Sequence, residues 1–369
     1  MLGRVLPLAE ALAARDHNVH VLGLQSDNAM PSAITFHTVG HEPFVREAHG
    51  KIRYSGMHLL FTMSNAAMRT TWQLYRIAPH VIVIVKPLPQ NTFGVWLYRV
   101  FRPRVKVVLD ADDFELTANV LTSFTQRAVL HVCARLAVRL SSYIVVATPF
   151  LSDHFTSLAG GKKPVELLIT GYSLPRTLPV TQPVLVPTIL YIGSVSQSSG
   201  HRVDLLPQVL AEVRKKIPTA KLLIAGDGDD MEPLKETFVK QGLAAAVTWH
   251  GRFSAEQIPG LVASCSVLID PVDASITQRA KSSSRVALAL AYGKVVITSN
   301  VGVRGKLLPF DWQQAWFAEP GNAMAYAAAI VTALNFPLTP TQQSALRQQA
   351  TQYTWENLAH QYEVILNTL

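Results

Sequence analysis

The sequence predicts an α/β protein built from two doubly wound domains, each with a parallel sheet covered by helices on both faces. Helical and strand-like apolar segments alternate along the 369 residues. Apolar runs such as VIVIV (81–85) are continuous, as in strands buried on both faces. The alternation stops at a proline-rich stretch and then starts again. At about 150 residues per domain, the length also suggests two domains.

The predicted elements of the first half, residues 1–173, follow from the spacing of their apolar residues. Helical spacing predicts helices at 4–15, 56–77, near 91–101 and near 120–140. Apolar, β-branched runs predict strands at 19–24, 81–85, 105–110 and 143–147. His37 and His41 are four residues apart, but Gly40 and Pro43 favour a loop over a metal-binding helix.

Residues 174–187 (LPRTLPVTQPVLVP) contain four prolines and no helical period, which predicts a linker. The second domain is expected at 188–353, and a closing helix at 354–369. Its predicted strands are 188–193, 220–226, 246–251, 266–270 and 294–299, and its helices are 203–216, 230–241, 255–264 and 284–292.

The composition excludes several classes of protein. Hydrophobic residues are 49% and charged residues 16%, which excludes intrinsic disorder as the main state. Cys133 and Cys265 are too few for a disulfide scaffold or a cysteine zinc site, and they fit a reducing compartment. No apolar stretch reaches the roughly 18 residues of a membrane span, so we expect a cytoplasmic protein.

The net charge lies mostly in the first half. The chain has 33 basic and 25 acidic residues, a net +8; residues 1–173 hold 17 and 11, a net +6. Such an excess suits an anionic partner such as a phosphate or an acidic membrane surface, although solubility alone also explains it. The basic residues are not interleaved with aromatic ones, which disfavours nucleic acid.

Two segments of the second half could bind phosphate. YIGSVSQSSGHRVDLL (191–206) places a glycine and serines between a strand and a helix, where His201 or Arg202 could add charge. A plain polar loop is an equal alternative. In QRAKSSSRVALALAYG (278–293), three serines open a helix beside Arg279, Lys281 and Arg285. Three cations at one helix start favour a bound diphosphate over a solvated cap.

Acidic residues follow two predicted strands. Asp110, Asp112 and Asp113, with Glu115 close behind, could orient a sugar, act as a base or simply cap a helix. Lys86 ends a neighbouring buried strand. After strand 220–226 come three more aspartates, Asp227, Asp229 and Asp230, for which helix capping is favoured over a metal site.

Together these segments resemble the GT-B glycosyltransferases, specifically the retaining family 4 enzymes. The resemblance rests on YIGSVSQ, LLIAGDGDDMEPL, VTWHGRFSAEQIPGLVASCSVLIDP and ALAYGKVVITSNVG in the second domain. In the first domain it rests on GRVLPLAEALAARDHNVHVLGL, and TWENLAHQYEVIL resembles the closing helix that packs back on that domain. The fold implied is two Rossmann-like domains facing a cleft.

The resemblance implies transfer of a sugar from a nucleotide-sugar, with retention and without an essential metal or other cofactor. The acceptor, a glycan or a lipid-linked sugar of cell-envelope polysaccharide synthesis, would bind the first domain at the inner membrane face. The implied catalytic residues are Asp112 and Asp113, and Gly3 and Lys86 lie on the acceptor side. The implied donor-binding residues are Gly193, Ser194, Arg202, His250, Arg252, Lys281, Ser282, Ser283, Ser284 and Arg285.

Three departures from the family pattern stand out. Ala280 and Leu288 replace two glutamates that contact the donor, which raises the alternative of a non-catalytic protein that binds a sugar nucleotide or a partner enzyme. Ser194 replaces an arginine, whose charge Arg202, Arg279 or Lys281 can supply. The family's first strand is missing, so we expect Met1 to be an internal methionine of a longer product.

Overall fold

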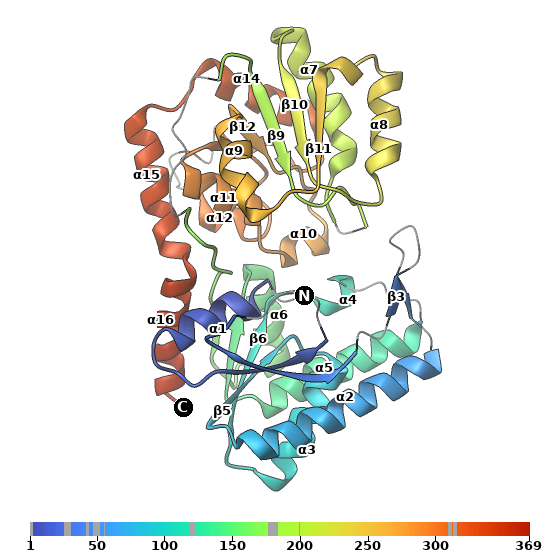
Figure 1. Cartoon of the computed structure of the whole chain (residues 1–369), viewed down its shortest axis with the longest axis vertical. Helices are drawn as coiled ribbons and strands as arrows, with labels where there is room; N and C mark the ends of the chain where they lie inside the picture. Colours follow the sequence, from blue (N-terminus) through green and yellow to red (C-terminus); the bar gives the residue numbers. More distant parts are fainter. Residues whose placement is uncertain are drawn as a thin grey trace. The chain divides into compact units, whose positions relative to one another are not determined.

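The computed structural model describes residues 3–25, 31–41, 44–46, 52–54, 56–118, 121, 123–175, 184–198, 200–308, 312 and 316–369. The chain divides into two compact units, Met1–Gly171 with Trp355–Leu369, and Tyr172–Thr354. Figure 1 labels the main elements of both. Of the predicted linker 174–187, residues 176–183 lie outside the described residues.

The first unit contains a parallel four-stranded sheet in the order β5-β6-β7-β8. Its strands are β5 (Val81–Val85), β6 (Lys106–Ala111), β7 (Tyr143–Val146) and β8 (Val165–Leu167). The strands β1 (His20–Leu24) and β2 (Thr35–Gly40) form a separate parallel pair, and β3 (Phe44–Arg46) pairs antiparallel with β4 (Ile52–Tyr54). His37, expected in a loop, lies in β2, where its ring stacks on His20.

Helices cover both faces of the sheet β5–β8. One face packs on α2 (Gly56–Ile77), α3 (Pro89–Phe101), α5 (Phe124–Leu140) and α6 (Pro149–Ala159), and the other on α1 (Val5–Ala13) and α16 (Trp355–Asn367). Successive residues of β6 point to opposite faces of the sheet. Val107 and Leu109 pack in the core under α2, α3, α5 and α6, and Val108 packs in the core under α1 and α16. A short helix, α4 (Glu115–Ala118), follows β6, and α5 begins later than expected because Ser123 and Gln126 form a capping box there.

The second unit contains a five-stranded parallel sheet in the order β11-β10-β9-β12-β13. The strands are β9 (Thr188–Ile192), β10 (Lys221–Ala225), β11 (Val247–Gly251), β12 (Val267–Ile269) and β13 (Val295–Ile297). The helices are α7 (Leu206–Lys216), α8 (Met231–Lys240), α9 (Ile258–Ala263), α10 (Ile276–Ala280), α11 (Ser284–Tyr292), α12 (Arg304–Leu307), α14 (Ala323–Asn335) and α15 (Pro340–Ala350).

The strand order of the second unit positions a site. The chain runs outward from β9 through β10 to β11, then crosses back to place β12 on the other side of β9. This reversal makes a topological switch point between β9 and β12, and in such sheets ligands bind beyond the carboxyl ends of the strands at that point. None of the described helices is long and apolar enough to span a membrane.

Candidate functional site

Two glycines let the loops that follow β9 and β10 pack backbone against backbone. A Cβ on Gly226 would lie 1.8 Å from the carbonyl oxygen of Gly193, and both residues have positive φ, +150° and +133°. The amides of Gly193 and Val195 donate to the carbonyls of Ala225 and Asp227 at 2.9 and 3.0 Å. The loop after β9 is thereby held in place at the switch point.

A fully buried aspartate, Asp270, follows β12 on the other side of the switch point. It forms ion pairs with Arg285, in the first turn of α11, and with Arg304 at 2.7 Å. The hydroxyls of Ser283 and Thr298 donate to its Oδ2 at 2.8 and 3.2 Å. Burial opposes ionisation of Asp270, but the two arginines outweigh it and hold its pKa well below the usual range.

The guanidinium of Arg285 fixes the geometry of the switch point. Its Nε donates to the carbonyl of Ile192 at 2.7 Å, and its Nη2 donates to the hydroxyl of Tyr191 at 3.0 Å. Nη1 pairs with Asp270, and the guanidinium lies over the Tyr191 ring, 4.5 Å from its centre. Arg285 therefore holds the end of β9 against α11 from inside the unit.

His201 completes this cluster as a neutral group. Its Nδ1 lies 2.8 Å from Arg285 Nη2, and since arginine only donates, Nδ1 accepts and Nε2 carries the ring proton. Burial, Arg285 and Lys281 lower the pKa of His201 to about 3. Of the two residues that the sequence offered as a source of added charge, His201 or Arg202, His201 does not supply it, because burial beside cations disfavours the imidazolium.

The cluster nevertheless keeps a positive excess. One carboxylate, Asp270, faces two guanidinium groups, those of Arg285 and Arg304, while His201 is neutral. Lys281 adds a further positive charge nearby. It helps to lower the pKa of His201, and its Nζ lies 3.8 Å from the position that a Cβ on Gly200 would occupy. The carboxyl ends of β9 and β12 thus present an electropositive environment beside backbone amides, which suits an anion.

The remaining predicted donor-binding residues are spread around this point. Ser283 caps α11 by accepting from the Val286 amide at 3.3 Å, and Ser284 is exposed. Ser194 offers its carbonyl to the Tyr191 hydroxyl, and Ser282 is half-buried. Arg202 pairs with Asp204 and Asp273, which offsets its charge.

Two predicted donor-side residues lie at the end of β11. His250 is exposed, and so is Arg252, whose Nε donates to Asp227 at 2.8 Å. Asp230, expected to cap α8, instead accepts from the backbone amide of Gln197 at 2.6 Å and so tethers the loop after β9. Among the described residues there is no group of three or more His, Cys, Asp or Glu side chains suited to a metal ion.

The first unit brings Lys86 and the predicted carboxylates together at the ends of β5 and β6. Lys86 has a left-handed backbone (φ +61°), unusual for a residue with a Cβ, and its amide is held by the Asp110 carbonyl at 3.0 Å. Its Nζ donates to Asp113 at 2.6 Å and lies 3.7 Å from Asp112 Oδ1. The carboxylates raise the pKa of Lys86 above its usual range despite burial, so the ammonium is charged.

Asp112 is the carboxylate of this cluster that is poised to exchange a proton near neutral pH. Its side chain is 16% exposed, and its Oδ1 accepts no hydrogen bond from the described residues. Burial raises its pKa to about 7, with Asp113 and Asp110 adding to the rise and Lys86 opposing it. Perturbed carboxylates of this kind mark candidate functional sites.

Asp110, by contrast, is part of the framework of the unit. Its Oδ2 accepts from Arg4 Nε at 3.0 Å and from the hydroxyl of Tyr362 on α16. Arg4 also donates to Thr170 Oγ1 and to the Leu168 carbonyl. This buried contact joins β6, α16 and the start of α1, while Gly3, immediately before Arg4, is exposed.

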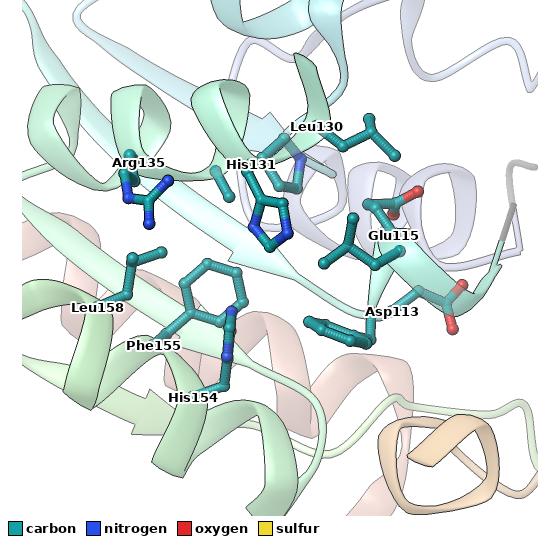
Figure 2. Close-up of a pocket in the computed structure, with 12 residues that line it drawn as sticks. Asp113, Glu115, Leu130, His131, Arg135, His154, Phe155 and Leu158 are labelled. Atoms are coloured by element: carbon teal, nitrogen blue, oxygen red, sulfur yellow. The ribbon is translucent and has the colours of Figure 1, made fainter. Parts of the chain in front are cut away.

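A pocket of about 150 Å³ lies beside Asp113. Figure 2 shows His131 and Arg135 on one side, His154 and Phe155 on the other, and Asp113 with Glu115 at one end. His131 and Arg135 come from α5, and His154 and Phe155 from α6. Burial and the nearby His131 lower the pKa of His154, so its imidazole is neutral at pH 7. The pocket offers apolar walls with cationic and carboxylate groups at its edges.

Sequence reasoning missed Asp270, Arg304, Arg4, Tyr362 and the difference in behaviour between Asp112 and Asp110. Asp270 had a signal, since it ends the apolar strand run SVLID. Arg4 and Tyr362 had no such signal. They lie 106 and 252 positions away from Asp110 in the sequence and meet it only in the folded chain.

Comparison with known proteins identifies the class of fold. Residues 186–335 match the family model described as Glycosyl transferases group 1. Sucrose-phosphate synthase from Thermosynechococcus elongatus superposes with a TM-score of 0.72 at 17% identity, over 98% of this chain and 91% of that one. HepE of Anabaena, in complex with UDP and glucose, superposes with a TM-score of 0.70 at 16% identity, over 100% of this chain and 97% of that one.

The lipopolysaccharide outer core galactosyltransferase WaaB, in its apo form, gives a TM-score of 0.71 at 11% identity, over 99% of this chain and 95% of that one. No curated protein matches the sequence significantly. The architecture defines a GT-B protein. Within this fold, residues 186–335 are a Glycosyl transferases group 1 domain.

Proposed function

We propose that this enzyme transfers a sugar from a nucleotide-sugar to a glycan or lipid-linked acceptor, with retention and without a metal, as in family 4. The observation that carries the proposal is the positive excess at the switch point of the group 1 domain, where Arg285 and Arg304 outnumber Asp270. A nucleoside diphosphate is the anion that such a domain releases. Because HepE was solved with UDP-glucose, UDP-sugars are the first donors to test.

On the donor side, the diphosphate would meet the loop after β9 and the first turn of α11. Backbone amides, Lys281 and the serine hydroxyls of residues 282–284 would bind its oxygens. Arg285 and Asp270 act as positioning residues, since their contacts hold the end of β9 against α11. His201, with its proton on Nε2, supplies a neutral donor.

On the acceptor side, Asp112 would take the proton of the attacking hydroxyl. A carboxylate whose pKa is raised to about 7 is a stronger base than an ordinary aspartate. The hydroxyl oxygen attacks the anomeric carbon on the face from which the diphosphate leaves, so the new glycosidic bond forms with retention while the bond between the sugar and the diphosphate breaks. Lys86 and Asp113 orient Asp112, and the pocket beside Asp113 would hold the acceptor.

We further propose that the enzyme works in the cytoplasm on cell-envelope polysaccharide, at the inner face of the membrane. The support is chemical: the first 173 residues carry a net +6 charge, 17 basic minus 11 acidic residues. Lipid-linked sugars are anionic through their phosphates, so a basic acceptor unit attracts them.

The test is release of nucleoside diphosphate from UDP-, GDP- and ADP-sugars by the purified chain, with and without acceptor glycolipids. Lys281→Ala and Arg285→Ala should each reduce turnover by at least about tenfold, because each substitution removes a positive charge that stabilises the departing diphosphate. Lys240→Ala, on the exposed face of α8, is the matched control and should turn over normally. Normal turnover in both test variants contradicts the assignment.

A non-catalytic role is the second candidate, and one observation favours it. Ala280 is buried and Leu288 half-buried, so the two positions where the family has donor-binding glutamates are apolar. A protein of this kind would bind a sugar nucleotide without consuming it. Tight binding with no hydrolysis or transfer, over all donors and acceptors tried, would select this alternative.

A further inference from the structure

Large apolar side chains cover the outer surface of α2 and α3 in the first unit. On α2, Phe61 is 72% exposed, Met68 63% and Trp72 55%; on α3, Phe101 is 66% exposed. The full set, called here the α2–α3 face, is Leu60, Phe61, Met68, Trp72, Tyr75, Trp96, Val100 and Phe101. The ring centroids of Tyr75 on α2 and Phe101 on α3 lie 6.3 Å apart, so the apolar residues of the two helices form one continuous surface.

Where α2 faces α3 its side chains are small and polar, whereas those on its outer surface are large and apolar. Thr71 is buried and donates to the Gly94 carbonyl at 3.0 Å. A Cβ on Gly94 would lie 2.8 Å from Thr70, so α2 and α3 approach too closely for bulky residues between them. Figure 1 shows the two helices side by side. Phe61, Met68 and Trp72 of α2 therefore point outward, whereas an ordinary surface helix buries its bulky apolar residues; on α2, Leu74 does so.

The segment that carries this face contains basic residues and no acidic ones. From Ala48 to Leu109, 62 residues, the sequence contains no Asp or Glu and nine Lys or Arg. Arg69 and Arg76 are exposed on α2, and Arg76 lies over the Trp72 ring at 4.7 Å. Arg102 and Arg104, both exposed, come shortly after Phe101 in the sequence.

We propose that the α2–α3 face docks on an anionic lipid bilayer, with its aromatic side chains at the headgroup boundary and its arginines on lipid phosphates. Exposed Trp, Tyr and Phe beside Arg, in a segment with no acidic residue, is the pattern of a helix that lies in a membrane interface. A second copy of the chain fits poorly, because a symmetric contact would set these arginines against themselves. The inference names the surface that would serve the membrane location proposed above, and the transfer reaction itself does not enter it.

The test is flotation of the full chain with vesicles of phosphatidylcholine alone and of equal parts phosphatidylcholine and phosphatidylglycerol. The protein should float with the anionic vesicles and much less with the neutral ones, and added salt should release it. Absence of binding to anionic vesicles, or equal binding to both, would overturn the proposal. A stable dimer in light scattering that does not bind vesicles would overturn it in favour of a second copy.

Two variants separate the apolar and the electrostatic contributions. Phe61→Ser with Trp72→Ser should lower binding to anionic vesicles more than about tenfold. Arg69→Gln with Arg76→Gln should lower it roughly 30-fold, at about a factor of five for each charge. All four residues are exposed, so the variants should melt within a few degrees of the parent.

The matched control is Val239→Ser with Phe336→Ser, which removes two exposed apolar residues from the second unit. Its binding should equal that of the parent. If it loses binding as strongly as the α2 variants, or if both α2 variants bind like the parent, the face is not the docking site. Nucleoside diphosphate release without acceptor should stay unchanged in all three variants, which keeps this test separate from that of the proposed function.

Discussion

Replacing Asp112 with asparagine should stabilise the protein above neutral pH. Burial raises the pKa of Asp112 to about 7, against 3.8 for an ordinary aspartate. Between these pH values the folded chain holds a proton that the unfolded chain has lost, so the free energy of unfolding falls as the pH rises from about 4 to 7. The difference of about three pH units, at about 1.4 kcal/mol each, sets an upper limit of about 4 kcal/mol.

The asparagine side chain has no charge to bury, so Asp112→Asn should gain a large part of this free energy at pH 8 and almost none at pH 4. Urea unfolding at the two pH values measures the gain. Asp153→Asn, at an exposed position of α6, is the control and should change the free energy of unfolding by less than about 0.5 kcal/mol. An Asp112→Asn variant that is less stable than the parent at pH 8, or shifted equally at both pH values, would refute the reasoning.

Three further changes test other parts of the structure. Asp270→Asn leaves two buried arginines without a counter-charge and should cost about 3 to 5 kcal/mol in urea unfolding; a loss below about 1 kcal/mol would contradict the cluster. Gly226→Ala would place a Cβ 1.8 Å from the Gly193 carbonyl and should lower the free energy of unfolding by more than about 2 kcal/mol, whereas Gly242→Ala, with open space around it, should lower it less. Tyr362→Phe removes the hydroxyl that donates to Asp110 and should cost about 1 to 3 kcal/mol; an unchanged urea midpoint would show that α16 does not depend on this contact.

Local patterns predicted much of the fold. The apolar spacing of residues 56–77 and 284–292 gave the bounds of α2 and α11, and the VIVIV run gave β5, because a strand buried on both faces has no polar side to hide. The same patterns missed β2, where the polar residues of FHTVG obscure the alternation. They also missed α4, which is shorter than any periodicity can reveal.

The candidate site was predictable only in part. Strand-end residues such as Asp112, Lys86 and Ser283 could be found because parallel strands bring their carboxyl ends to one edge of a sheet. Their electrostatic behaviour could not be found in this way. The distance from Lys86 to Asp113, the burial of Asp112 and the pairing of Arg285 with Asp270 depend on contacts between segments far apart in sequence.

The most direct test of the proposed function is a thermal-shift panel of UDP-, GDP- and ADP-sugars on the purified chain, with Lys281→Ala beside it. We expect one nucleotide class to raise the melting temperature of the parent, and the variant to respond only at higher concentration, because a ligand that binds only the folded state stabilises it in proportion to its affinity. No response to any nucleotide-sugar from the well-folded parent, or an equal response in the variant, would contradict a donor site at the carboxyl ends of β9 and β12.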